Sequence, residues 1–265
     1  AAIMFASAFV MLVFLREQPE QLQQNATLGA ETGPIRPAND ARNTARENFL
    51  LTITNPKLWL LGLSLGLLNA CRYGFLDWGL THLKEVQETG VGHAAIKIAV
   101  LPFGAIAGSY IAGWATDRFF DSRRAPVTCI LLVVLSLLTL LYHPVANSKS
   151  VPATMVLLIL IGFCIYGPQV LLVGTAPADL ARKGTSAAAA GFVNCLGYIG
   201  AASGDYFTGR SLDAAKGGAV DSTGWENTIY LWAAWAFAAA IAAGLLWGAR
   251  DRKSTRLNSS HTSIS

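Results

Sequence analysis

Charged residues are scarce in this sequence. Asp, Glu, Lys and Arg make up 14% of the 265 residues, whereas hydrophobic residues make up 53%. The hydrophobic residues fall into blocks of about 16–24, close to the length that a helix needs to cross a bilayer. This balance is typical of a membrane protein.

Catalytic and metal-binding motifs are also absent. The cysteines form no C-x-x-C pair and each lies inside an apolar block, so packing is the expected role of Cys71, Cys129, Cys164 and Cys195. None of the four histidines stands at ligand spacing from a cysteine or an acid, and no nucleotide-binding glycine loop is present. The sequence therefore predicts a protein that is not an enzyme and that uses no cofactor, no metal and no nucleic acid.

The most informative apolar block runs from residue 55 to residue 86. Asn55 can cap the first amides of a helix, and Pro56 suits the first helical position. About twenty nearly uncharged residues follow, enough to span a bilayer, and Arg72 interrupts them. Arg72 lies roughly 21 Å along the helix axis from Leu58, well inside a hydrocarbon core about 30 Å thick.

An arginine at that depth needs a polar partner. Burying it costs at least about 2.5 kcal/mol, so we expect Arg72 to face the protein interior or a wet cavity. Its planar, permanently charged guanidinium suits a phosphate or a carboxylate. An internal ion pair without any ligand is the alternative interpretation.

Five further apolar blocks are expected to be membrane-spanning helices: 94–115, 127–142, 151–174, 185–207 and 229–248. With the first block they form two groups of three within a domain predicted over residues 55–250. Gly167 and Pro168 should kink the fourth helix.

The remaining segments are assigned from their composition. Residues 1–15 are expected to be the end of a preceding transmembrane helix, and residues 16–54 a polar linker with a weak helix over 40–51. Residues 251–265 are a tail, of which 254–265 look like vector-derived sequence.

Lys and Arg are distributed unevenly around the expected spans. Segments 16–57, 118–124, 182–183 and 250–256 carry fourteen of them, and the segments on the opposite side carry five. Because positively charged segments favour the cytoplasmic side, the linker and the C-terminus are predicted to be cytoplasmic in a multi-pass protein of the plasma (inner) membrane.

Several motifs carry a resemblance to a known family: R-Y-G-F-L-D-W at 72–78, L-K-E-V at 83–86, I-Y-G-P at 165–168 and G-W-A-T-D-R at 113–118. Over about residues 55–250 the chain resembles the organophosphate:phosphate antiporter family of the major facilitator superfamily. The likeness is strongest to its glycerol-3-phosphate carriers, followed by its hexose-phosphate carriers. The resemblance implies an all-α membrane protein, namely the six-helix C-terminal half of such a transporter plus the end of the preceding helix.

The resemblance also implies a substrate site. Arg72 would contact the substrate phosphate together with a second arginine from the N-terminal half, which the sequence is expected to lack. Tyr166 and Tyr198 would line the central cavity. Asn194 shares a helix face with Tyr198, and Gln169 is a further polar candidate.

Asn69 departs from the family pattern, which usually has a tyrosine three residues before the arginine; it is a candidate for substrate binding. Asp77 matches an acid at the interface between the halves, with a gating or structural pairing to a lysine of the other half. Asp117 and Arg118 are expected to form a gating or ion-pair group in a signature loop. That loop lacks the usual glycine after the acidic-basic pair and is one residue longer than usual.

The function implied by the resemblance is exchange of a small organophosphate, glycerol-3-phosphate or a hexose phosphate, for inorganic phosphate by alternating access. A membrane sugar-phosphate sensor of the same family is the main alternative. A sugar or drug transporter of the superfamily is a third, which would leave Arg72 without an anion. The expected partners are these phosphates, the lipid bilayer and the N-terminal half of the same protein.

Overall fold

The structure is a computed structural model that describes residues 45–88, 90–182, 185–216 and 223–247. Regular structure in these residues is entirely helical. The expected end of a preceding helix, most of the linker and the tail lie outside the described residues.

The described residues form twelve helical elements, namely the short helix α3 and eleven elements that make up six long segments. Their bounds are α3 Ala45–Ile53, α4 Pro56–Tyr73, η2 Gly74–Trp78, α5 Gly79–Val86, α6 Val91–Ile98, α7 Leu101–Phe119, α8 Arg124–Asn147, α9 Val151–Val170, η3 Leu171–Thr175, α10 Ala176–Leu180, α11 Ser186–Lys216 and α12 Thr223–Gly244. The six segments follow the six apolar blocks in order, so helices at these six places are confirmed, whereas α11, from the block 185–207, is not among the candidate membrane spans.

The start of α4 is built as its sequence indicates. The Asn55 side chain accepts a hydrogen bond from the Lys57 amide at 3.1 Å, and Pro56 occupies the first turn. The Asn55 Nδ2 also donates to the Leu180 carbonyl at 3.0 Å. The cap therefore fixes the start of α4 against the end of α10.

One expectation about helix bounds is corrected. The third span was expected over 127–142, but α8 runs from Arg124 to Asn147 and includes Pro144. Arg124, in its first turn, forms an ion pair with Asp179, with Arg124 Nε 2.9 Å from Asp179 Oδ2. In the fourth span Pro168 lies inside α9, and the π-helical segment η3 begins three residues later.

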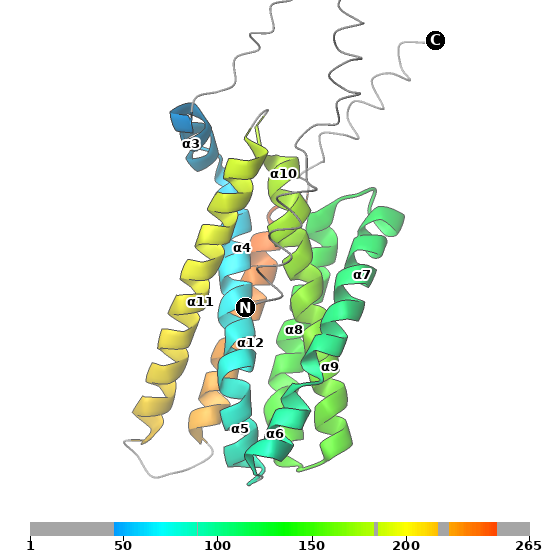
Figure 1. Ribbon diagram of the computed structural model, residues 1–265, viewed down its shortest axis with the longest axis vertical. Coiled ribbons are helices and arrows are strands. Elements are labelled where there is room, and N and C mark those ends of the chain that lie inside the picture. Colours follow the sequence, from blue (N-terminus) through cyan, green and yellow to red (C-terminus); the bar gives the residue numbers. More distant parts are fainter. Residues whose placement is uncertain (1–44, 89, 183–184, 217–222, 248–265) are drawn as a thin grey trace, which may run out of the picture. The chain divides into compact units, whose positions relative to one another are not determined.

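The helices pair in a way that follows from two repeats of three. Helix α4 packs against α11 and α12, α9 packs against α7 and α8, and α8 packs against α12 (Figure 1). If α4, α7 and α8 correspond to α9, α11 and α12, each of these pairs maps onto another pair or onto itself. Such a two-fold relation between helix pairs is the pattern expected of nested repeats.

Glycines set the closest helix contacts. A Cβ added at Gly200 of α11 would lie 2.3 Å from the Cα of Gly66 in α4, and one added at Gly108 of α7 would lie 2.3 Å from the Phe163 carbonyl oxygen in α9. Gly113, the first residue of the G-W-A-T-D-R motif, makes no such contact, since nothing in the described part of the chain lies within 4 Å of a Cβ added there.

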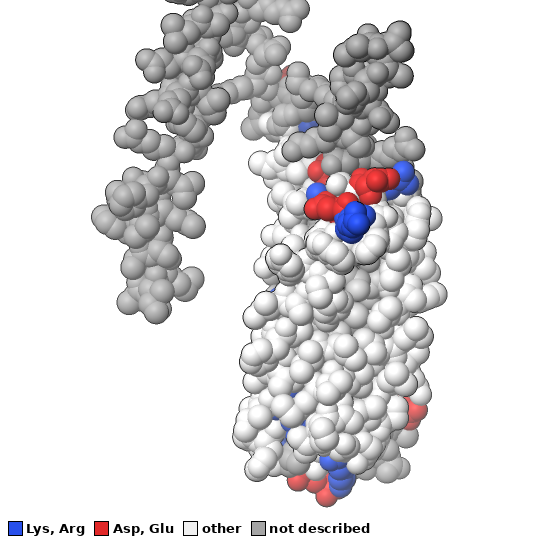
Figure 2. Space-filling view, turned by 90° about the vertical axis from the view of Figure 1, so that its right-hand side faces the viewer, with Lys and Arg blue, Asp and Glu red and all other residues white. Residues whose placement is uncertain are grey.

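The bundle has the dimensions and surface of a membrane protein. Four segments are long and apolar enough to cross a bilayer, namely Val91–Phe119, Arg124–Asn147, Val151–Leu180 and Gly224–Gly244. Arg46–Ile53 together with Pro56–Val86 is a fifth candidate, bent by 73° between its two parts. The face in Figure 2 carries its charges near the two ends, with a broad uncharged belt between them.

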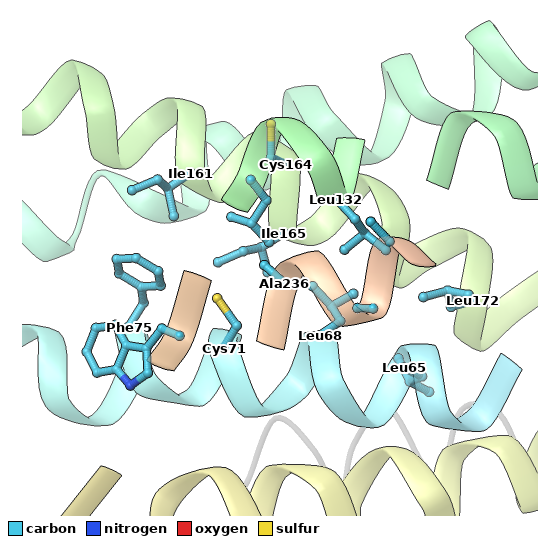
Figure 3. Packing of buried hydrophobic residues seen from close by; sticks show 14 of the residues in the cluster. Leu65, Leu68, Cys71, Phe75, Leu132, Ile161, Cys164, Ile165, Leu172 and Ala236 are labelled. Carbon is cyan, nitrogen blue, oxygen red and sulfur yellow. The ribbon is translucent and has the colours of Figure 1, made fainter. Parts of the chain in front are cut away.

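The core positions the critical face of α4. Leu65, Leu68 and Cys71 of α4 and Phe75 of η2 point toward residues of α8, α9 and α12 (Figure 3). Arg72 lies four residues after Leu68 and one after Cys71, so its side chain leaves the helix about 40° from that of Leu68 and about 100° from that of Cys71, at the edge of this buried face. Burial of this face thus places Arg72 at the border of the core.

Candidate functional site

Arg72 lies at the end of α4, half-buried and surrounded by polar and aromatic groups. Its Nη1 donates a hydrogen bond to Asn69 Oδ1 at 3.3 Å. Its Cζ lies 4.8 Å from the ring centre of Tyr73 and 5.2 Å from that of Tyr166. These are distances at which a guanidinium is attracted to an aromatic face. The structure therefore brings together three of the predicted residues, Arg72, Asn69 and Tyr166.

The charge of Arg72 has no acidic partner inside the described residues, where no carboxylate oxygen comes within 4 Å of it. Its Nε is buried and lacks a hydrogen-bond partner there. The Oε1 of Gln169, one turn beyond Tyr166 on α9, is in the same condition. A buried polar atom without a partner costs about 1–3 kcal/mol, so this site gains from a ligand that supplies oxygens and hydroxyl groups.

The two π-helical segments stand next to this site. Arg72 and Tyr73 end α4 immediately before η2, whereas Tyr166 and Gln169 end α9 immediately before η3. The α4 and α9 helices are the corresponding first helices of the two repeats. Single π-helical turns inside α-helices are frequent at functional sites.

Asn69 is almost fully buried between helices of the bundle, so little of its side chain is open to a ligand. It is 3% exposed, and its Nδ2 donates to the Gly197 carbonyl of α11 at 3.1 Å. The amide thus connects Arg72 on one side with α11 on the other.

Tyr198 and Asn194 lie on α11, and neither is joined to Arg72 by a hydrogen bond or ring contact among the described residues. Tyr198 is 58% exposed and Asn194 is half-buried. Their role in binding stays a prediction.

Asp77 lies in η2 and is exposed. It is close enough to Asp205 of α11 for the two carboxylates to repel each other. Asp205 was not singled out from the sequence, because its proximity to Asp77 depends on the packing of two helices. Neither acid forms an ion pair within the described part of the chain.

Asp117 and Arg118 are both exposed at the end of α7. Asp117 accepts a hydrogen bond from Ser122 Oγ at 3.0 Å. The ion pair at this end joins Arg124 of α8 to Asp179 of α10. Sequence reasoning missed Asp179, although an acid directly before Arg182 and Lys183 was a signal for a charged helix end.

A buried polar cluster at the other end was also missed. His82 Nδ1 lies 3.2 Å from the Tyr142 hydroxyl, and His82 Nε2 lies 3.4 Å from His143 Nδ1. Nearby, the Lys97 ammonium donates to Gln87 Oε1, and Gln87 Nε2 donates to the Ala146 carbonyl at 3.0 Å. These contacts join the α5–α6 region to α8. No group of three potential metal ligands occurs among the described residues.

Comparison with known proteins gives a consistent set of relatives. The sequence profile of the Major Facilitator Superfamily matches residues 1–204. A glycerol-3-phosphate transporter of Bacillus subtilis is 31% identical over 206 residues, which are 77% of this chain and 44% of the relative. The membrane sensor protein UhpC of Escherichia coli is 31% identical over 61% of this chain and 36% of its own length. A probable hexose phosphate transport protein of Chlamydia pneumoniae is 29% identical over 62% and 36%. The chain thus spans less than half the length of these relatives.

Proposed function

Because this chain belongs to the major facilitator superfamily, and is therefore a multi-pass membrane protein rather than an enzyme, we propose that it forms the C-terminal half of an antiporter for organophosphates. The exchanged solutes are glycerol-3-phosphate or a hexose phosphate in one direction and inorganic phosphate in the other. The observation that carries this proposal is the Arg72 guanidinium, which has aromatic neighbours, an unpartnered Nε and no carboxylate within reach in the described residues.

The chemistry of the site favours a phosphate over a neutral solute. A guanidinium can donate two parallel N–H bonds to two phosphate oxygens, and such charge-assisted bonds are roughly twice as strong as neutral ones. Tyr166 and Tyr198 would supply hydroxyl donors, and Asn194 and Gln169 would contact the hydroxyl groups of the organic part. A neutral sugar or an apolar drug would leave Arg72 charged and unpaired at membrane depth.

The N-terminal half of the protein would complete the site. We expect a second arginine in the first span of the N-terminal half. We also expect a basic group of the N-terminal half to lie against Asp77 and Asp205, whose negative charges are not neutralised within the described residues. Rocking of the two halves about the site between them would give alternating access. Asp117 and Arg118 would act as a charged group at the opposite, cytoplasmic end. By itself, the present chain is expected to insert into membranes but not to transport.

Sidedness in the plasma membrane can be tested by thiol labelling. Lys149 and Arg182 are exposed in the turns after α8 and α10, and Cys195 is the exposed native cysteine to be replaced first. Cysteines placed at Lys149 and Arg182 are expected to react from opposite sides, Arg182 from the cytoplasm. Labelling of both from one side would contradict the topology. His143 is unsuitable as a labelling position, because it is buried inside α8.

The function is tested by phosphate counterflow in proteoliposomes that contain the full-length protein. We expect exchange of phosphate for glycerol-3-phosphate or glucose-6-phosphate, and its near-complete loss in Arg72→Lys at unchanged membrane expression. Loss of one charge-assisted hydrogen bond costs about 1.5–3 kcal/mol, which is roughly a ten- to hundredfold loss of affinity. Normal exchange by Arg72→Lys, or recovery in Arg72→Gln combined with Asp77→Asn, would show that Arg72 serves an ion pair and not the substrate.

A membrane sensor of sugar phosphates is the second candidate, supported by the similarity to UhpC of Escherichia coli. A sensor and a transporter need the same phosphate site, so the residues around Arg72 do not separate them. Equilibrium binding of the same phosphates, measured beside counterflow, separates the two: binding without exchange supports the sensor.

A further inference from the structure

Asn69 has both ends of its side-chain amide engaged by the protein. Its Oδ1 accepts from Arg72 Nη1 at 3.3 Å, and its Nδ2 donates to the Gly197 carbonyl at 3.1 Å. It is 3% exposed. A side chain so enclosed offers little surface to a solute, but it can hold the arginine in one orientation.

The hydrogen bond that Arg72 donates to Asn69 decides which edge of the guanidinium is left without a hydrogen-bond partner. Nη1 lies on the side of Cδ, whereas Nε and Nη2 share the other edge and donate two parallel N–H bonds. Asn69 takes Nη1, and Nε has no hydrogen-bond partner in the described structure. The rings of Tyr73 and Tyr166 further limit the tilt of the guanidinium plane.

We propose that Asn69 is a positioning residue that fixes the rotation of the Arg72 guanidinium so that its Nε–Nη2 edge binds the substrate phosphate. This inference rests on the proposed function and deepens it. Since Asn69 is itself anchored to the Gly197 carbonyl, the orientation of Arg72 follows the contact between α4 and α11. That contact is tight, because Gly66 and Gly200 meet there backbone to backbone.

The test compares two variants of the full-length protein with a matched control. Asn69→Leu keeps the number and branching of the side-chain heavy atoms and removes both hydrogen bonds. Gly197→Ala leaves Asn69 in place but adds a Cβ 3.1 Å from its Nδ2 and 2.8 Å from Leu65 Cδ2, so it presses on both side chains. The control is Ser64→Ala, which removes a buried bond of the same kind from α4, that of Ser64 Oγ to the Ala239 carbonyl at 3.0 Å, without touching arginine.

The expected readout is a split between affinity and turnover in phosphate counterflow. Asn69→Leu should raise the KM for phosphate about tenfold, the equivalent of about 1.4 kcal/mol, while turnover per folded molecule stays within about twofold. Gly197→Ala should raise KM in the same direction. Ser64→Ala should leave KM unchanged, because the hydrogen bond that it removes involves neither Asn69 nor Arg72.

The outcomes separate this inference from the function on which it rests. If wild type exchanges phosphate and Arg72→Lys does not, but Asn69→Leu and Gly197→Ala have normal KM values, Asn69 has no positioning role and the proposed function stands. If one of the two variants fails to fold, the KM of the other decides. A rise in KM for Ser64→Ala as large as for Asn69→Leu would reduce the effect to packing and overturn the inference. Absence of exchange and of phosphate binding in wild type would overturn both.

Discussion

The contact between Gly66 and Gly200 predicts a sharp difference between two glycines of the same helix. A Cβ at Gly200 would lie 2.3 Å from the Cα and the carbonyl oxygen of Gly66, whereas ordinary contacts begin at 3.4 Å, so in Gly200→Ala the helices must separate by about 1 Å. Overpacking of this kind costs about 1–3 kcal/mol. At Gly191, also on α11, nothing in the described chain lies within 4 Å of an added Cβ. Gly191→Ala should instead gain up to about 1 kcal/mol, because alanine favours the helix.

Both variants replace glycine by alanine within α11, so the gain in helix propensity is common to them. Their free energies of unfolding should therefore differ by the overpacking cost of about 1–3 kcal/mol. For a protein of this size, each 1 kcal/mol shifts Tm by about 2–4 °C, so Gly200→Ala should melt roughly 2–12 °C below Gly191→Ala. Thermal unfolding of the purified chain in detergent, followed by tryptophan fluorescence, measures the difference. Equal Tm values for the two variants would refute the argument that backbone contact between α4 and α11 limits the residue at position 200.

Other contacts make further predictions. Gln87→Leu should lower Tm more than Lys97→Met does. The first variant leaves the buried Lys97 ammonium without its amide partner, whereas the second removes the charge itself. A lower Tm for Lys97→Met than for Gln87→Leu would contradict this reasoning. Single and double alanine variants of Arg124 and Asp179 should give a coupling of about 0.2–1 kcal/mol in urea unfolding, since the pair is partly exposed. Tyr142→Phe should cost about 1–3 kcal/mol by removing the hydroxyl from buried His82, whereas an unchanged unfolding midpoint would show that the bond is not formed.

Much of this architecture could be predicted from local sequence. An apolar block of sufficient length becomes a spanning helix wherever it lies, so the six segments and their order were predictable. The Asn55–Pro56 start was equally local, because a cap depends on neighbours within a single turn. The errors fell at helix ends: α8 extends past the predicted 127–142 at both ends, to Asn147 and to Arg124, which forms an ion pair with Asp179, distant in sequence.

The candidate site, too, could be predicted only where it depends on a single helix. The depth of Arg72 follows from counting residues along one helix, and the cost of a charge at that depth required a functional or structural partner. The identity of that partner does not follow from counting. Asn69 contacts Arg72 within α4, but Tyr166 comes from α9, and the carbonyl that anchors Asn69 comes from α11.

What the sequence alone determined is therefore the set of helices and the presence of a buried cation among them. Both follow from the length of apolar blocks and from the free energy of placing charge in hydrocarbon. What only the tertiary structure decided is which groups meet. Gly66 and Gly200 set the distance between α4 and α11, and His82 reaches His143 across 61 positions of sequence. Such meetings depend on the rotation and separation of packed helices, which arise from side-chain and backbone contacts between segments far apart in the chain.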